Sequence, residues 1–309
     1  MNKIYNECRK AVSVIVPVHN EQSGVKASIQ QIIETMEKSL LKYEILVIDD
    51  GSTDETCKEI MDCRSIRVAI TDKTTEPKIK VLSHPYNKGY GAALKTGIKH
   101  ARYDTIVITD ADCTYPIDKI PILLEAYRSG GYDMVVGART GDSAQIPLVR
   151  RPAKWMLGKL ASYLTDFKIP DLNSGLRVIR KDAVVRFNKI LPDGFSFTTT
   201  ITLAMLTNGN LIKYIPINYH KRKGSSKIRP IKDTLNFVQL IIRTVLYFNP
   251  LKIFIPLSVL LVISAFLLSF LSWLLAGRIM DVGTGTLLMT AVIVMSIGML
   301  ADLIDKRMP

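Results

Sequence analysis

Two long stretches without charged residues constrain the architecture of this chain more than any other feature. Ile253 to Leu275 is 23 residues long, Gly283 to Ala301 is 19 residues long, and neither contains a charge. At about 1.5 Å of rise per residue, each is long enough to cross a hydrocarbon core of about 30 Å as a helix. We therefore expect residues 251–309 to form a two-helix transmembrane hairpin. A pair of buried core helices is the disfavoured alternative, because apolar residues cover all their faces.

The basic residues predict how this hairpin is oriented. The chain has 41 Lys and Arg residues against 28 Asp and Glu residues, a formal net charge of +13. Six basic residues and no acid lie between Lys221 and Lys232, and Lys306 and Arg307 follow the hairpin. Because basic residues flanking membrane spans stay on the cytoplasmic side, we expect a multi-pass protein of the cell inner membrane with its soluble domain and both termini in the cytoplasm.

The same basic cluster bears on the partners of the chain. A polybasic segment beside an apolar stretch fits an anionic bilayer surface better than it fits nucleic acid. The sequence has no zinc-ligand spacing, no helix-turn-helix signature and no basic-aromatic interleaving of the RNA-binding kind. We therefore expect a lipid bilayer as partner, and no nucleic acid.

Residues 229–250 form a segment of their own between the basic cluster and the hairpin. Apolar residues recur there at helical spacing, namely Leu235, Val238, Ile241, Ile242 and Val245. This pattern predicts an amphipathic helix that lies in the bilayer interface. A helix packed on the soluble domain is an alternative with almost equal support.

Residues 1–228 have the pattern of a single α/β domain. Short apolar runs at 13–18, 43–48, 79–82, 105–109 and 133–137 predict strands, and the segments 25–40 and 92–101 between them predict helices. A further helix is expected after Ser52, because Ser52-x-x-Glu55 is a capping-box pattern. Strands that alternate with helices predict a mostly parallel, doubly wound sheet. Ligands of such sheets bind beyond the carboxyl ends of the strands.

Polar residues follow three of these strands directly, as Asn20-Glu21, Asp49-Asp50 and Asp110-Ala111-Asp112. Two carboxylates separated by one residue at a strand end can face a divalent cation and a diphosphate together. A dehydrogenase-type dinucleotide site is disfavoured, because Gly89-Tyr90-Gly91 lacks the third glycine of that fingerprint.

Five motifs occur in an order that resembles a known family. They are Val-Pro-Val-His-Asn-Glu (16–21), Asp-Asp-Gly-Ser-Thr-Asp (49–54), Asn-Lys-Gly-Tyr-Gly-Ala-Ala (87–93), Asp-Ala-Asp (110–112) and Asn-Ser-Gly-Leu-Arg (173–177). The series resembles family 2 glycosyltransferases with the Rossmann-like GT-A fold. With the terminal hairpin, the chain is similar to the branch that contains dolichyl-phosphate mannose synthases and bacterial undecaprenyl-phosphate glycosyltransferases.

The resemblance implies an activity and its cofactor. It implies a membrane-anchored, inverting enzyme that moves one sugar from a UDP- or GDP-linked donor to a polyprenyl phosphate, with Mg²⁺ or Mn²⁺. Homo-oligomerisation stays open. Two alternatives also stay open: a transferase that extends a saccharide, and a membrane-anchored protein that binds a nucleotide sugar with reduced catalysis.

The resemblance further implies roles for individual residues. Asp112 is expected to coordinate the metal, with Asp110 reaching metal or ribose, and Arg177 is expected to grip a phosphate unless it forms a surface ion pair. The other expected nucleotide-sugar contacts are Pro17, Asn20, Glu21, Asp50, Gly89, Gly91 and Ala111. The acceptor phosphate is expected to meet Lys221, Arg222 and Lys227, with Arg150, Arg151 and Lys154 as a second candidate patch.

Two departures from the family pattern matter. Thr114 stands where many relatives have Gln or His, and a hydroxyl is a weaker metal ligand. The segment 195–200 contains no carboxylate, although many relatives carry a Glu in this region. A missing general base matters less for a phosphate acceptor, because that nucleophile is already ionised. The second departure therefore favours a lipid-phosphate acceptor.

Overall fold

The computed structural model describes residues 11–64, 79–140, 151–219, 230–278 and 281–307, and these contain a seven-stranded sheet in the order β3-β2-β1-β4-β6-β5-β7. The strands are β1 (Ala11–Val18), β2 (Lys42–Asp49), β3 (Ile79–Ser83), β4 (Thr105–Ile108), β5 (Met134–Ala138), β6 (Arg177–Arg180) and β7 (Ile212–Pro216). β6 runs antiparallel to β4 and β5, and the other pairs are parallel. The predicted mostly parallel α/β sheet is confirmed.

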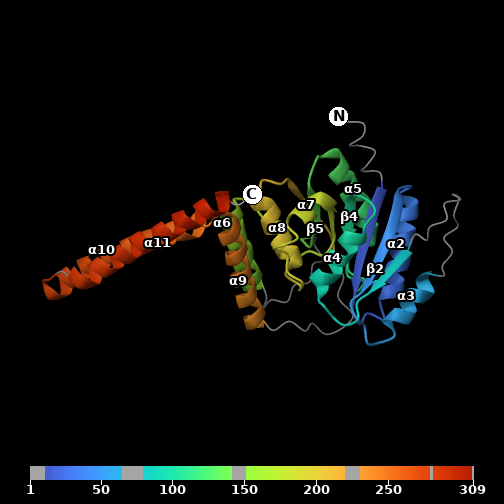
Figure 1. The fold of residues 1–309 in the computed structure, drawn as a ribbon, viewed down its shortest axis with the longest axis horizontal. Coiled ribbons are helices and arrows are strands. Elements are labelled where there is room, and N and C mark those ends of the chain that lie inside the picture. Colours follow the sequence, from blue (N-terminus) through green and yellow to red (C-terminus); the bar gives the residue numbers. More distant parts are fainter. Residues whose placement is uncertain (1–10, 65–78, 141–150, 220–229, 279–280, 308–309) are drawn as a thin grey trace.

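Helices flank this sheet, and a long hairpin projects away from it (Figure 1). The helices are α2 (Val25–Lys38), α3 (Thr56–Arg64), α4 (Tyr90–His100), α5 (Ile120–Ser129), α6 (Arg151–Thr165), α7 (Lys181–Arg186), α8 (Phe197–Thr207), α9 (Pro230–Phe248), α10 (Leu251–Ala276) and α11 (Asp281–Arg307). Successive residues of β1 point to opposite faces, so Val14 and Val16 join the core under α2 and α5 while Ile15 joins the core under α4 and α8. Burial on both faces explains why this strand is continuously apolar.

The start of α3 differs from the expected capping box. The helix begins at Thr56, whose backbone N–H donates to Asp54 Oδ1 at 3.0 Å. The Ser52 hydroxyl instead accepts a hydrogen bond from the backbone N–H of Asn20 at 3.1 Å. Ser52 therefore ties the loop after β2 to the loop after β1. Asp54, and not Ser52, accepts the hydrogen bond from the first backbone N–H of α3.

The two C-terminal helices form the expected hairpin. Only 6% of the apolar window of α10 and 11% of that of α11 are buried, so the core-helix alternative is wrong. The helices contact each other through small and hydroxyl-bearing residues: Ser269 and Thr284 lie 2.8 Å apart, and a Cβ at Gly298 would lie 2.5 Å from Phe254. Both helices are long and apolar enough to cross a membrane.

The second half of α9 packs on the soluble domain. Ile241 and Val245 are fully buried among apolar residues of α6 and α8. Gln239, Arg243 and Tyr247 occupy the opposite face of the helix and are exposed. α9 runs across the root of the hairpin (Figure 1). The second half of α9 is therefore packed on the soluble domain, which was one of the two expectations for this segment. Contact of its outer face with a bilayer stays a prediction.

Candidate active site

The loops that follow β1, β2 and β4 meet at one edge of the sheet. Val18 at the end of β1 pairs with Asp49 at the end of β2, and Ile15 pairs with Ile108 at the end of β4. The antiparallel strand β6 starts opposite Ile108, so the segment 173–176 enters the same edge. This carboxyl edge therefore brings together Asn20, Asp50, Asp110, Asp112 and the motif at 173–177.

Asp110 is half-buried and held from two sides. The Tyr90 hydroxyl donates to Asp110 Oδ1 at 3.0 Å. On the other side lies Gly175, where an added Cβ would sit only 2.7 Å from Asp110 Oδ2. Burial, together with the charge of Asp110, raises the pKa of Tyr90, so this hydroxyl stays a proton donor.

Asp112 is oriented by its own loop. Its Oδ1 accepts hydrogen bonds from the backbone N–H of Thr114 at 3.1 Å and from the Thr114 hydroxyl at 2.6 Å. The Ser28 hydroxyl donates to the carbonyl of Ala111 at 2.9 Å and fixes the loop to α2. Thr114 is buried, and its hydroxyl and backbone N–H both support the Asp112 carboxylate.

Asp50 lies directly after β2 and contacts the loop between β3 and α4. Its side chain is buried, and its oxygens accept hydrogen bonds from the backbone N–H groups of Lys88 at 2.9 Å and Gly89 at 2.8 Å. His84 Nδ1 lies 2.6 Å from the same carboxylate. Asp50 therefore anchors the loop between β3 and α4. Its expected hydrogen bonds to base or ribose stay a prediction.

Gly89 and Gly91 lie against the turn at 192–194, and their expected contact with a donor stays a prediction. A Cβ at Gly89 would lie 2.5 Å from the carbonyl oxygen of Asp193, and one at Gly91 would lie 2.2 Å from that of Pro192. Gly89 also has a φ of 105°, which favours glycine. These glycines admit the turn at 192–194 against the start of α4.

Arg177 is the first residue of β6. It is fully buried, and its guanidinium donates to the carbonyls of Ser174 and Thr198 and to the Thr202 hydroxyl. Burial lowers the pKa of this arginine. This burial excludes a surface ion pair, and the hydrogen bonds tie the 173–177 motif to α8. The expected contact of Arg177 with a phosphate stays a prediction.

Pro17, Asn20 and Glu21 frame this edge from the side of β1. Pro17 is buried within the strand opposite Ile48. Asn20 has a φ of 56°, and its Oδ1 accepts a hydrogen bond from the backbone N–H of Thr53 at 2.8 Å. Glu21 donates its backbone N–H to the Thr56 hydroxyl at 2.9 Å. All three support the loops around the site.

Three further features at this edge were missed at the level of the sequence. Tyr90 is the first; in the sequence it was considered only as the middle residue of Gly89-Tyr90-Gly91 and as a member of the 87–93 motif. Arg139, directly after β5, forms a two-pronged ion pair with the buried Asp171, with N···O distances of 2.7 and 2.9 Å. The Thr199 hydroxyl donates to Asn173 Oδ1. Of these three, only Arg139 could have been found from the sequence, because it is a charged residue shortly after a predicted strand.

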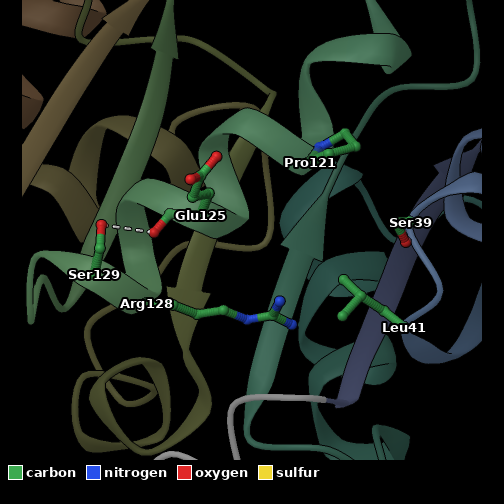
Figure 2. Close-up of a pocket in the computed structure, with 6 residues that line it drawn as sticks. All are labelled: Ser39, Leu41, Pro121, Glu125, Arg128 and Ser129. Carbon is green, nitrogen blue, oxygen red and sulfur yellow. Dashed lines mark hydrogen bonds between the residues drawn. The ribbon is translucent and has the colours of Figure 1, made fainter.

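A cavity of about 390 Å³ lies at the opposite edge of the sheet. Figure 2 shows Arg128 of α5 reaching toward Leu41, which directly precedes β2. Because β2 is eight residues long, this cavity and Asp50 are separated by the length of the strand, about 26 Å. The cavity is therefore distinct from the candidate active site.

Family models match most of the described structure. The model "Glycosyl transferase family 2" matches residues 13–187, which include both aspartates at the end of β4. The chain belongs to glycosyl transferase family 2. A second model, "GtrB C-terminal hairpin", matches residues 249–306 of this family 2 protein.

Two curated relatives and one solved structure illustrate what this family 2 chain is similar to. It is 29% identical to a prophage bactoprenol glucosyl transferase homolog of Escherichia coli K12, over 66% of this chain and 63% of that one. It is 29% identical to a dolichol-phosphate mannosyltransferase of Pyrococcus furiosus, over 71% and 59%. The chain therefore spans about three fifths of the length of either relative.

The solved structure is glucosyl-3-phosphoglycerate synthase from Mycobacterium tuberculosis with Mn²⁺, UDP-glucose and phosphoglyceric acid. Its TM-score is 0.58 at 17% identity, over 78% of this chain and 81% of that one. A likeness at this identity shows the shared fold of the soluble part.

The donor set of the family 2 site fits a hard divalent cation. Asp110 and Asp112 offer carboxylate oxygens, and the described ranges contain no group of three or more His, Cys, Asp or Glu residues that would form a complete cage. Mg²⁺ is commonly held by one or two carboxylates, with water and substrate phosphates completing the shell. Two carboxylates at the end of β4 match that arrangement.

The expected acceptor residues cannot be placed here. Lys221, Arg222, Lys227 and Arg150 lie outside the described residues, and the side chains of Arg151 and Lys154 lie outside them too. Their roles stay predictions.

Proposed function

We propose that this protein is a membrane-anchored inverting glycosyltransferase that transfers one sugar from a UDP- or GDP-linked donor to a polyprenyl phosphate. One observation carries the proposal: a family 2 domain and a GtrB-type hairpin occur in the same chain. The bactoprenol glucosyl transferase homolog and the dolichol-phosphate mannosyltransferase are named for transfer to lipid carriers, which supports a lipid acceptor here.

The chemistry proposed for the site is a single displacement. An oxygen of the lipid phosphate attacks the anomeric carbon, and the bond from that carbon to the nucleoside diphosphate breaks. A bound Mg²⁺ or Mn²⁺ would neutralise the charge that develops on the leaving diphosphate. Asp110 and Asp112 would hold that ion, with Tyr90 and Thr114 keeping their carboxylates in place. No general base is required, because the attacking phosphate is already ionised.

The proposed topology places the carboxyl edge beside the cytoplasmic surface of the inner membrane. Residues 1–228 form the catalytic domain, residues 229–250 the segment at the interface, and residues 251–309 the anchor. The polybasic run would then meet anionic headgroups, and Lys221, Arg222 and Lys227 would receive the lipid phosphate.

The experiment uses the full-length protein in detergent or in vesicles, with undecaprenyl phosphate and a panel of labelled UDP- and GDP-sugars. We expect one donor to yield an organic-soluble product with one sugar per lipid, and both chelation of divalent metal and Asp112→Asn to abolish it. A product that grows beyond one sugar would support the saccharide-extending alternative. Nucleotide binding without transfer, for all donors, would support the alternative with reduced catalysis.

A further inference from the structure

Tyr90 connects the carboxylate of Asp110 to an exposed aromatic ring. Its hydroxyl donates to Asp110 Oδ1 at 3.0 Å. Its ring stacks on Phe195, with centroids 5.6 Å apart and planes inclined by 17°. Phe195 is 82% exposed, although an aromatic side chain is more often covered. Phe195 at the surface therefore contacts Tyr90, and Tyr90 in turn contacts Asp110, a candidate metal ligand.

The turn that carries Phe195 is fastened to the start of α4. The backbone N–H of Ala92 donates to the carbonyl of Asp193 at 3.0 Å, and Lys95 Nζ donates to Asp193 Oδ1 at 2.7 Å. The turn approaches so closely that Gly91 has no room for a Cβ. The backbone, and not burial in a core, therefore fixes the ring of Phe195 over that of Tyr90.

On another side Asp110 faces the backbone of the 173–177 motif. Gly175 faces the carboxylate: a Cβ at this position would lie 2.7 Å from Asp110 Oδ2, so only glycine leaves space for the carboxylate. Gly175 is itself held, because its backbone N–H donates to the Tyr115 hydroxyl at 2.7 Å. Asp110 thus rests against a fixed backbone on one side and is directed by the Tyr90 hydroxyl on the other.

We propose that Tyr90 is a positioning residue that keeps the Asp110 carboxylate directed at the divalent cation and the donor diphosphate, and that Phe195 holds the Tyr90 ring in place. This inference rests on the proposed function. Groups that orient a metal ligand from behind typically change metal affinity or activity about 10- to 100-fold when they are removed. The loss of one hydroxyl should therefore be visible in metal binding itself.

The first test is Tyr90→Phe in the full-length protein. Free Mn²⁺ is measured by electron paramagnetic resonance during titration in the presence of UDP, and transfer is measured separately. We expect Mn²⁺ to bind about 10-fold more weakly and kcat/KM for the donor to fall by a similar factor, while KM for the polyprenyl phosphate stays unchanged. Tyr43→Phe is the matched control, because Tyr43 also donates to a carboxylate, Glu37 Oε1 at 2.6 Å, at the other end of β2.

The second test addresses the stacked ring. Phe195→Leu keeps an apolar side chain but removes the flat surface, so we expect a smaller loss of Mn²⁺ affinity, about 3-fold, that Phe195→Tyr restores. Phe167→Leu is the control at another exposed phenylalanine. Wild-type affinity in both Tyr90→Phe and Phe195→Leu would overturn the inference. If the wild-type protein binds Mn²⁺ and UDP but transfers no sugar, the proposed function fails while this inference is still decided by the titration.

Discussion

Asp50 and Asp110 follow two strands that flank β1, at the same edge of the sheet, yet their surroundings differ. Asp50 is 3% exposed and accepts hydrogen bonds from two backbone N–H groups, with His84 beside it. Asp110 is half-buried and accepts a hydrogen bond from the hydroxyl of Tyr90. A carboxylate whose oxygens accept hydrogen bonds from buried backbone N–H groups contributes to the stability of the fold. A carboxylate that is partly open and steered by a hydroxyl is suited to a ligand.

The largest expected effect comes from removing the charge of Asp110. In Asp110→Asn the amide oxygen still accepts the hydrogen bond of Tyr90, so we expect the free energy of unfolding to change by less than about 0.5 kcal/mol. Transfer should fall about 1000-fold, equivalent to about 4 kcal/mol, because the charge that holds the cation is lost. Transfer assays and denaturant unfolding of the same preparation test this. Retained transfer would contradict the comparison.

The same kind of change at Asp50 should act on stability. Asp50→Ala leaves the backbone N–H groups of Lys88 and Gly89 buried without their acceptor, so we expect a loss of about 3 kcal/mol in the free energy of unfolding. Asp50→Asn keeps one acceptor oxygen and should lose less. An unchanged unfolding midpoint together with lost nucleotide binding would show that Asp50 acts mainly as a nucleotide contact and not as a structural anchor.

The sequence predicted the part of the fold that local patterns encode. Continuous apolar runs located β1 to β5, and uncharged length located the hairpin. β6 and β7 were missed, because Arg177-Val-Ile-Arg180 is short and carries a charge at each end. The antiparallel insertion of β6 depends on pairing with β4 about 70 residues earlier in the chain, which no local pattern records.

The sequence predicted where the polar residues of the site gather, but not what surrounds each of them. Asp50 and Asp110 lie at one edge of the sheet, as expected of residues that follow parallel strands. Whether a carboxylate or a guanidinium faces a ligand depends on which distant groups surround it, such as Thr198 and Thr202 around Arg177. Those contacts form between segments that lie far apart in the sequence, so motif order alone does not reveal them.

Gly91 gives a smaller effect that separates packing from ligand access. Gly91→Ala would place a Cβ 2.2 Å from the carbonyl oxygen of Pro192, so either α4 or the turn must shift. We expect a loss of about 2 kcal/mol in the free energy of unfolding, a size typical of overpacked sites. Gly194→Ala is the matched control, because nothing lies within 4 Å of its added Cβ. Equal stability of the two variants would mean that the turn does not press on α4.

The smallest effect concerns Tyr43, the counterpart of Tyr90 at the opposite edge. Burial, and then its hydrogen bond to Glu37, raise the pKa of Tyr43 above the ordinary value of 10.0. Below pH 10 this tyrosine is protonated in both states, and Tyr43→Phe should cost about 1 kcal/mol for the lost hydrogen bond. Above pH 10 the unfolded wild-type chain releases the proton first, so the free energy of unfolding of the wild type falls as pH rises.

The difference between wild type and Tyr43→Phe should therefore fall above pH 10, by up to about 1.4 kcal/mol per pH unit, and should vanish or change sign by about pH 11. Denaturant unfolding at pH 8 and at pH 11 measures it, with Tyr86→Phe as the control at a tyrosine that is 65% exposed. A constant difference would show that the Tyr43 hydroxyl ionises as readily in the folded chain as in the unfolded one. The Tyr43–Glu37 pair would then be open to water, and it would no longer serve as a buried comparison for the Tyr90–Asp110 pair.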